Sequence, residues 1–187
     1  LAKENKKFLY SVIRKSARAK EFENALQWLL EAGLIHKVHH LSAPKIPLEA
    51  HAEFEYFKVY VSDVGLLGAM VNLSPKLLIQ EYGLLQEFRG SLLENYVSQT
   101  LVAAGFGLYY WTSEGKAELD YILQVDTRVL PLEIKSGESS KKKSLQVYLQ
   151  KYQPEFGIRS SPMNLKKDGH ILNCPLYLLG SLREIAS

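Results

Sequence analysis

Two apolar segments separated by a short turn constrain the fold of this chain more than any other feature. "AELDYILQ" (117–124) and "VLPLEIKS" (129–136) have the composition of strands. The four residues 125–128 between them predict a β-hairpin. Asp120 lies five residues before Val125 and Glu133 five residues after Arg128, so the hairpin places these two acids beside each other.

The second of these strands carries an acid and a base inside an apolar run. Because side chains alternate along a strand, Glu133 and Lys135 are expected on one face. Leu130, Leu132 and Ile134 are expected on the other face. For Glu133 and Lys135 alone, the competing interpretation is an exposed ion pair on an edge strand, which contributes at most about 1 kcal/mol.

The first strand is expected to direct Asp120 away from Leu119 and Tyr121. Two carboxylates that stand opposite each other repel, which destabilises a sheet unless a positive group lies between them. Lys135 is one such group and a divalent cation is another.

A third acid comes from a predicted helix, "GSLLENYVSQTLVAAG" (90–105), entered after Gly90 and closed at Gly105. At about 100° per residue, Glu94 lies within about 60° of Val97 and about 20° of Leu101. Glu94 is therefore expected on or beside the apolar face of the helix. Carboxylates are rarely buried without a partner.

Glu94, Asp120 and Glu133 together, with Lys135 beside them, suit a hard, oxygen-preferring ion such as Mg²⁺ or Mn²⁺. Such an ion binds a phosphate oxygen and lowers the pKa of a water molecule. Lys135 would orient that water or offset the charge that grows on the phosphate in the transition state. The predicted chemistry is hydrolysis of a phosphodiester.

These residues resemble a known family. "ELDYIL" and "LEIK" resemble the D…ExK core of the PD-(D/E)XK nuclease-like superfamily, and Glu94 matches the helical glutamate that precedes that core in many members. More narrowly, "FKVYVSDVGLL", "GSLLENYV", "YYWTSEGKAELDYIL" and "LPLEIKSG" resemble the domain of unknown function at the C-terminus of many prokaryotic AAA+ family ATPases. The resemblance runs from about Lys3 to Ile185.

The resemblance implies a restriction-endonuclease-like α/β fold, with a mixed sheet flanked by helices. It implies metal ligation by Glu94, Asp120 and Glu133, and catalysis by these acids with Lys135. Tyr110, Trp111 and Ser136 are the implied neighbours of the site. Leu119 departs from the superfamily pattern, in which proline often precedes the aspartate.

The family also implies partners. In those ATPases a P-loop module comes first, then a winged-helix-like segment, then the nuclease-like domain. No G-x-x-x-x-G-K-[ST] loop occurs in this sequence, so the ATPase module is expected as an N-terminal partner in a longer chain. DNA or RNA is the implied substrate.

The expected domain organisation has three parts. Residues 1–44 are assigned to a partial winged-helix-like segment, because a helix closed by Gly33 precedes a strand over 34–41; a plain helical hairpin is the alternative. Residues 45–55 contain two prolines and no periodicity and are assigned to a linker. Residues 56–187 form the nuclease-like domain, with a strand at "FKVYVSD", a helix capped by Asp63 and a later helix at "SLQVYLQKYQP".

Composition narrows the class of protein. Hydrophobic residues make up 47% of the 187 residues and charged residues 23%, which is typical of a globular protein. The single cysteine, Cys174, excludes an internal disulfide framework and favours a cytoplasmic location. No apolar run approaches the roughly 20 residues of a membrane-spanning helix, so no membrane partner is expected. Basic residues cluster in the first 20 positions and at 141–143.

Two other function classes remain open at this stage. The net charge of +3 is modest for a groove around a duplex, which favours a regulatory module that binds nucleic acid or protein with little or no cleavage. A structural appendage that holds ATPase subunits in an oligomer is the other class. A metal cluster formed by His36, His39, His40 and His51 is less favoured than four surface histidines.

Overall fold

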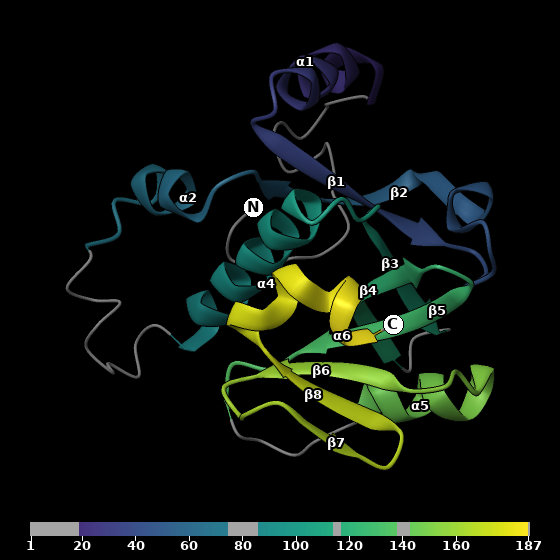
Figure 1. Cartoon of the computed structure of the whole chain (residues 1–187). Helices are drawn as coiled ribbons and strands as arrows, with labels where there is room; N and C mark the ends of the chain where they lie inside the picture. Colours follow the sequence, from purple (N-terminus) through teal and green to yellow (C-terminus); the bar gives the residue numbers. More distant parts are fainter. Residues whose placement is uncertain (1–18, 75–85, 114–116, 138–142, 187) are drawn as a thin grey trace. The chain divides into compact units, whose positions relative to one another are not determined.

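A computed structural model describes residues 19–74, 86–113, 117–137 and 143–186 (Figure 1). Most of the basic residues predicted to cluster near the N-terminus, together with Lys141 and Lys142, lie outside these ranges. The chain divides into two compact units, each built from two segments. The first contains residues 1–38 and 56–99, and the second contains residues 39–55 and 100–187.

The described residues form five α-helices and a mixed sheet of eight strands, so the predicted mixed α/β fold is confirmed. The helices are α1 (Ala19–Glu31), α2 (Val64–Met70), α4 (Gln86–Ala103), α5 (Lys143–Tyr152) and α6 (Leu182–Ala186). The strands are β1 (Ile35–Leu41), β2 (Ala52–Val61), β3 (Tyr109–Ser113), β4 (Ala117–Val125), β5 (Arg128–Ile134), β6 (Gly157–Ser161), β7 (Lys166–Asp168) and β8 (Ile171–Pro175). Their order in the sheet is β2-β1-β3-β4-β5-β6-β8-β7.

The first unit begins with the predicted helix, glycine and strand. After α1, Gly33 adopts a φ of +67°, a left-handed conformation that glycine accepts without strain. β1 follows, and Leu26 and Phe57 form a small buried cluster. The assignment of this region to a winged helix stays a prediction.

Two further helices of the chain test the predicted helix boundaries. The carboxylate of Asp63 accepts a hydrogen bond of 2.9 Å from the Leu66 N–H and caps α2, as predicted. α4 begins at Gln86, so the prediction that this helix starts after Gly90 is wrong. A glycine inside a helix costs only about 1 kcal/mol relative to alanine, which is too little to end a helix.

The core of the second unit lies where α5 packs against β4 and β5. Trp111 of β3 meets the rings of Tyr148 and Tyr152 edge-on, at centroid distances of 5.2 and 5.6 Å. The Trp111 indole N–H also donates to the Tyr152 hydroxyl over 3.2 Å, which satisfies the polar atom of a residue that is 2% exposed.

The hairpin of β4 and β5 has the predicted turn. Val125 pairs with Arg128, and the register continues to the pair of Tyr121 and Leu132. Asp126 in the turn has a φ of +52°, as two-residue hairpin loops require. The register ends at that pair, so the pairing of Asp120 with Glu133 stays a prediction.

β5 is a central strand, because β4 and β6 flank it on either side. Glu133 is buried, as are the other residues from Leu130 to Ile134. The competing interpretation of Glu133 and Lys135 as an exposed pair on an edge strand is therefore wrong. A strand that is paired on both sides and covered on both faces has no solvent-exposed face for such a pair.

β4 deviates from regular alternation. Its register against β3 shifts next to Tyr110, so that Asp120 and Tyr121 both stand opposite this one residue. Such an extra residue is a β-bulge. Leu119 and Ile122, on either side of the bulge, contact the same buried cluster. The expected alternation of side chains through Asp120 therefore does not hold.

The segment assigned to a linker, residues 45–55, contains a 3-10 helix (Leu48–His51) and the start of β2. Leu48 from this segment is 2% exposed and belongs to the core of the second unit. Near the C-terminus, β8 ends at Pro175, and a 3-10 helix (Leu176–Ser181) and α6 follow it.

Replacing Gly157 with alanine is expected to destabilise the second unit. A Cβ atom at this position would lie 2.8 Å from Leu145 Cδ1 and 3.2 Å from Leu149 Cδ2 of α5. Such overpacking costs about 1–3 kcal/mol, measured as a lower urea midpoint with an unchanged m-value. Gly137→Ala is the matched control, because its Cβ would meet no atom of the described residues within 4 Å. Equal stability of the two variants would contradict this packing.

Candidate functional site

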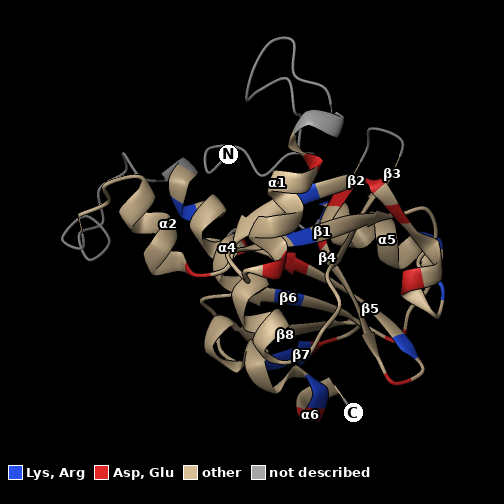
Figure 2. Ribbon diagram, turned by 90° about the horizontal axis from the view of Figure 1, so that it is seen from above, with Lys and Arg blue, Asp and Glu red and all other residues tan. Residues whose placement is uncertain are grey.

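Charged residues of both signs are spread over the strands and helices of the described chain (Figure 2). Among them, Glu133 and Lys135 form an ion pair, with 2.8 Å between Glu133 Oε1 and Lys135 Nζ. The side chain of Glu133 is 5% exposed and that of Lys135 is 29% exposed. The acid is therefore inside the protein, while the base reaches solvent.

One oxygen of the buried acid remains available. Glu133 Oε2 is buried and has no hydrogen-bond partner among the described residues. An unsatisfied buried carboxylate oxygen is costly, and it is rare unless the group has a ligand or a catalytic role. This atom therefore marks Glu133 as a candidate for ligand binding.

Asp120 lies beside the same strand. Its Oδ2 accepts a hydrogen bond of 2.7 Å from the backbone N–H of Ile134, the residue that follows Glu133. The carboxylate thus acts as the acceptor for a strand amide next to the bulge, and this contact fixes its position. The structure brings together three of the predicted residues: Asp120, Glu133 and Lys135.

The carboxylates of Asp120 and Glu133 match part of the ligand set that a divalent cation needs. Mg²⁺ usually keeps several waters and takes one or two protein carboxylates, and Asp120 with Glu133 provides two. Within the described ranges, no group of three or more histidine, cysteine, aspartate or glutamate side chains has the arrangement of a metal site.

Glu94, the fourth predicted residue, belongs to the first unit. Its Oε2 accepts a hydrogen bond of 2.9 Å from the Tyr60 hydroxyl. Next to it, the Asn95 side chain bonds both the N–H and the carbonyl of Val61, which ties α4 to β2. The prediction that Glu94 joins the acids of the second unit stays a prediction.

The three implied neighbours have different surroundings. Tyr110 stands opposite the bulge that contains Asp120. Burial and the charges of Glu118 and Glu53 raise the pKa of Tyr110 to about 12. Trp111 packs into the core, as described above, and Ser136 is exposed.

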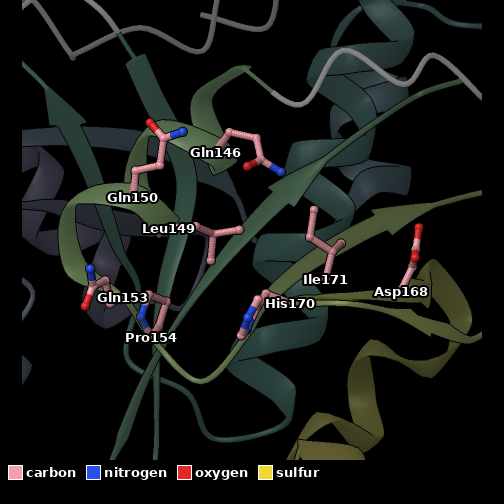
Figure 3. Close-up of a pocket in the computed structure, with 8 residues that line it drawn as sticks. All are labelled: Gln146, Leu149, Gln150, Gln153, Pro154, Asp168, His170 and Ile171. Carbon is pink, nitrogen blue, oxygen red and sulfur yellow. The ribbon is translucent and has the colours of Figure 1, made fainter.

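A cavity of about 710 Å³ lies elsewhere in the second unit, between α5 and the turn from β7 to β8 (Figure 3). Its polar lining consists mainly of the carboxamides of Gln146, Gln150 and Gln153. His170 Nδ1 lies 3.2 Å from the Glu155 carbonyl oxygen. The lining includes none of the four predicted site residues, and it contains no nucleophile paired with a base.

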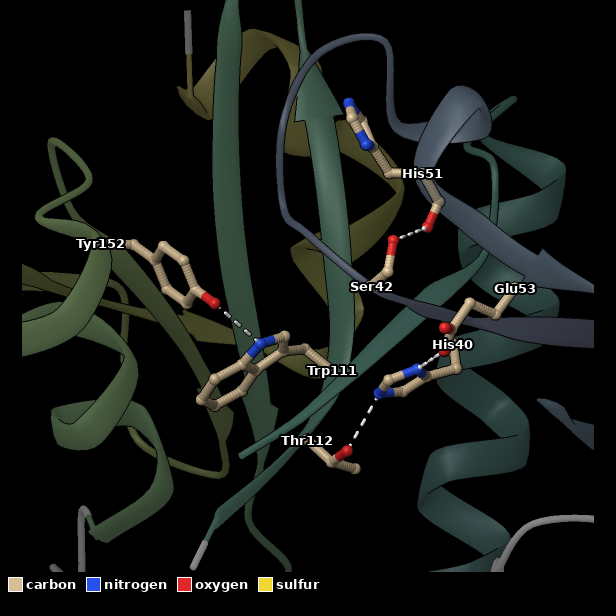
Figure 4. A network of polar contacts seen from close by, with 7 residues as sticks. All are labelled: His40, Ser42, His51, Glu53, Trp111, Thr112 and Tyr152. Atoms are coloured by element: carbon tan, nitrogen blue, oxygen red, sulfur yellow. Dashed lines mark hydrogen bonds and ion pairs between the residues drawn. The ribbon is translucent and has the colours of Figure 1, made fainter. Parts of the chain in front are cut away.

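Within the part of the chain that the structure describes, no histidine belongs to a group of three or more metal-ligating side chains. His36 Nδ1 lies 3.2 Å from the Ser98 hydroxyl, and burial lowers the pKa of His36. His40 uses both ring nitrogens, at 2.6 Å from Glu53 Oε2 and 2.9 Å from Thr112 Oγ1 (Figure 4). His40 therefore has no nitrogen left for a metal.

Cys174 is fully buried in β8. Burial raises the pKa of its thiol to about 11. A thiol with so high a pKa is a poor nucleophile at neutral pH, which excludes Cys174 as a reactive group.

A polar row that the sequence analysis missed continues from Glu133 across the sheet. Glu133 is in register with Arg159 of β6, and Arg159 is in register with Asn173 of β8. Asn173 is 3% exposed. The sequence signal was Arg159 in "GIRSS" and Asn173 in "ILNCP". Their alignment with Glu133 depends on parallel pairing of distant strands and could not be predicted from these segments alone.

Comparison with protein families gives two matches. Residues 89–178 match the domain of unknown function DUF4143. The DUF4143 match contains all four predicted site residues. Residues 1–77 match a second domain of unknown function, DUF8612. No curated protein and no solved structure matches the chain. No helix within the described ranges is long and apolar enough to cross a membrane.

Proposed function

We propose that this chain is a PD-(D/E)XK-type nuclease module that hydrolyses phosphodiester bonds of DNA or RNA with the help of Mg²⁺ or Mn²⁺. The observation that carries the proposal is the unpartnered Oε2 of Glu133, a buried acid that pairs with Lys135 and precedes Ile134, whose amide donates to Asp120. The sequence resemblance assigns the same residues to this role.

The proposed cation would be held by Asp120 and Glu133, and when bound it would polarise a phosphate oxygen and lower the pKa of a water molecule. Asp120 is fixed for this role by its hydrogen bond from Ile134. Glu133 contributes Oε2 while its Oε1 holds Lys135. Both contacts hold the carboxylates in place within the protein.

Lys135 has a separate task. An ammonium group has three N–H donors, and the ion pair with Glu133 occupies one direction. The side chain is partly exposed, so its remaining donors can contact a phosphate oxygen that approaches from solvent. A fixed positive charge at this point stabilises the negative charge that develops on the phosphate during hydrolysis.

A regulatory module that binds nucleic acid without cleavage is the second candidate. The observation that favours it is the net charge of +3, which is small for a nuclease groove. In both proposals an N-terminal ATPase module of a longer chain is the partner that controls access. The two candidates differ in whether Mn²⁺ supports cleavage.

Mn²⁺ is expected to bind the chain and to raise its thermal midpoint. At a concentration 100 times the dissociation constant, a ligand of the folded state adds about 2.7 kcal/mol of stability. Glu133→Gln and Asp120→Asn are expected to abolish this shift and to abolish Mn²⁺-dependent cleavage of labelled DNA and RNA. Asp126→Asn, an acid in the turn of the same hairpin, is the matched control, because asparagine tolerates its positive φ.

The outcomes separate the candidates. Binding of nucleic acid in EDTA, without cleavage in Mn²⁺ or Mg²⁺, selects the regulatory module. An equal Mn²⁺ shift in the wild type and in Glu133→Gln contradicts the proposed metal site.

A further inference from the structure

The polar row beside Glu133 extends to the edge of the sheet. Glu133 of β5 is aligned with Arg159 of β6, Arg159 with Asn173 of β8, and Asn173 with Lys166 of β7. Residues that are in register on neighbouring strands project from the same face. The two basic residues lie on neighbouring parts of the sheet, and Figure 2 marks basic residues in blue on β6 and β7.

Asn173 organises this row. Its Oδ1 accepts hydrogen bonds from the Ser161 hydroxyl at 2.6 Å and from Arg159 Nε at 3.2 Å. Its Nδ2 donates to the backbone carbonyls of Met163 and Asn164 at 2.8 and 2.9 Å. One buried amide therefore fixes both the loop after β6 and the orientation of the guanidinium group.

The guanidinium group of Arg159 is held in place by hydrogen bonds, and no described carboxylate offsets its charge. Apart from the bond to Asn173, its only other contact within the described chain is a weak one from Nη2 to Met163 Sδ at 3.7 Å. No described carboxylate forms an ion pair with Arg159. A preorganised guanidinium with free N–H donors is well suited to a phosphate group.

A cavity of about 440 Å³ opens over this part of the row. Arg159, Asn173 and Lys166 all contribute to its lining, together with the loop that Asn173 holds. One acid, Asp168, also lines it. Asp168 is in register with Ile171, not with Asn173. It therefore lies two residues along β7 from Lys166, about 6–7 Å away from the row that joins Lys166 to Glu133.

We propose that Arg159 and Lys166 bind backbone phosphates of the same polynucleotide strand that is cut at Glu133 and Lys135. This inference rests on the proposed function for the identity of the ligand. Three strand spacings separate Glu133 from Lys166, about 14 Å in all. A strand in a duplex carries one phosphate per 3.4 Å of helix axis, so the row can lie beside about four phosphates. Contacts of this kind hold the strand in register and do not read its sequence.

The test is binding of labelled oligonucleotides by the whole chain in EDTA, where cleavage cannot occur, at several salt concentrations. Each lost phosphate contact is expected to reduce the slope of log K against log salt by about 0.7 for single strands and about 0.9 for duplexes. Arg159→Gln combined with Lys166→Gln is therefore expected to reduce the slope by about 1.4 to 1.8.

Lys167→Gln is the matched control. Lys167 is the next residue of β7, on its opposite face, where its ammonium group lies 4.9 Å from the centre of the Phe156 ring. Lys167→Gln removes one positive charge, as Lys166→Gln alone would, but it is expected to leave the slope nearly unchanged. Thermal denaturation of each variant verifies that the fold is intact, and Arg159→Lys, which keeps the charge, is expected to retain most of the slope.

The results distinguish this inference from the proposed function. If the double variant and Lys167→Gln have the same slope as the wild type while the wild type cleaves, the phosphate row is wrong and the nuclease proposal stands. If the double variant loses salt-dependent binding, but neither the wild type nor any variant cleaves nucleic acid, the phosphate row is supported and the nuclease proposal fails.

Discussion

Lys135→Ala is expected to cleave nucleic acid about 10²- to 10³-fold more slowly than the wild type in Mn²⁺, the range observed when one fixed donor to a developing negative charge is removed. The reason is the geometry of the ion pair. Glu133 holds the ammonium group at 2.8 Å at the end of β5, so its charge is in place before the substrate arrives. The measurement is single-turnover cleavage with enzyme in excess.

Lys135→Arg is the control for this prediction, because it keeps a positive charge beside Glu133. It is expected to retain more activity than Lys135→Ala, although the shape and hydration of the two groups differ. Binding in EDTA separates the chemical step from substrate affinity. Cleavage that persists at the wild-type rate in Lys135→Ala would place the activity at another site.

The largest loss of folding stability is expected when only one partner of the Glu133–Lys135 ion pair is replaced. Lys135→Met leaves a buried carboxylate without a counter-charge and is expected to cost about 3 kcal/mol. Glu133→Gln leaves a partly exposed ammonium group that water can solvate, so it is expected to cost at most about 1 kcal/mol. Urea denaturation, with m-values compared, measures both.

The double variant Glu133→Gln, Lys135→Met completes a cycle. Because it removes the unpaired charge, it is expected to be more stable than Lys135→Met alone, which is a non-additive result. Equal losses from the two single variants would show that Glu133 is better solvated than its 5% side-chain exposure implies.

Local sequence signals predicted the central hairpin well. The turn at Asp126 fixes the register of β4 and β5, so the proximity of Asp120 and Glu133 followed from counting residues outward from the turn. Gly33 and Asp63 likewise marked a helix end and a helix start because their conformational and capping preferences are local.

Features that depend on distant residues were not predicted. The parallel pairing of β5, β6 and β8 joins segments separated by loops and a helix, and nothing near Arg159 in the sequence indicates that it aligns with Glu133. The bulge opposite Tyr110 is set by the fit of β3 to β4. The hydrogen bond from the Ile134 amide to Asp120 joins two different strands and was not predicted either.

The second unit is built from two separate segments of the chain, residues 39–55 and 100–187, which limits where the protein can be truncated. A fragment that begins at the DUF4143 boundary, residue 89, lacks Leu41 and Leu48, which are 0% and 2% exposed in the core of this unit. It also lacks His39 and His40, the parallel partners of Tyr109 and Tyr110, and would leave β3 as an open edge prone to self-association. Recombinant work on the candidate site therefore requires residues 39–55 in the same polypeptide.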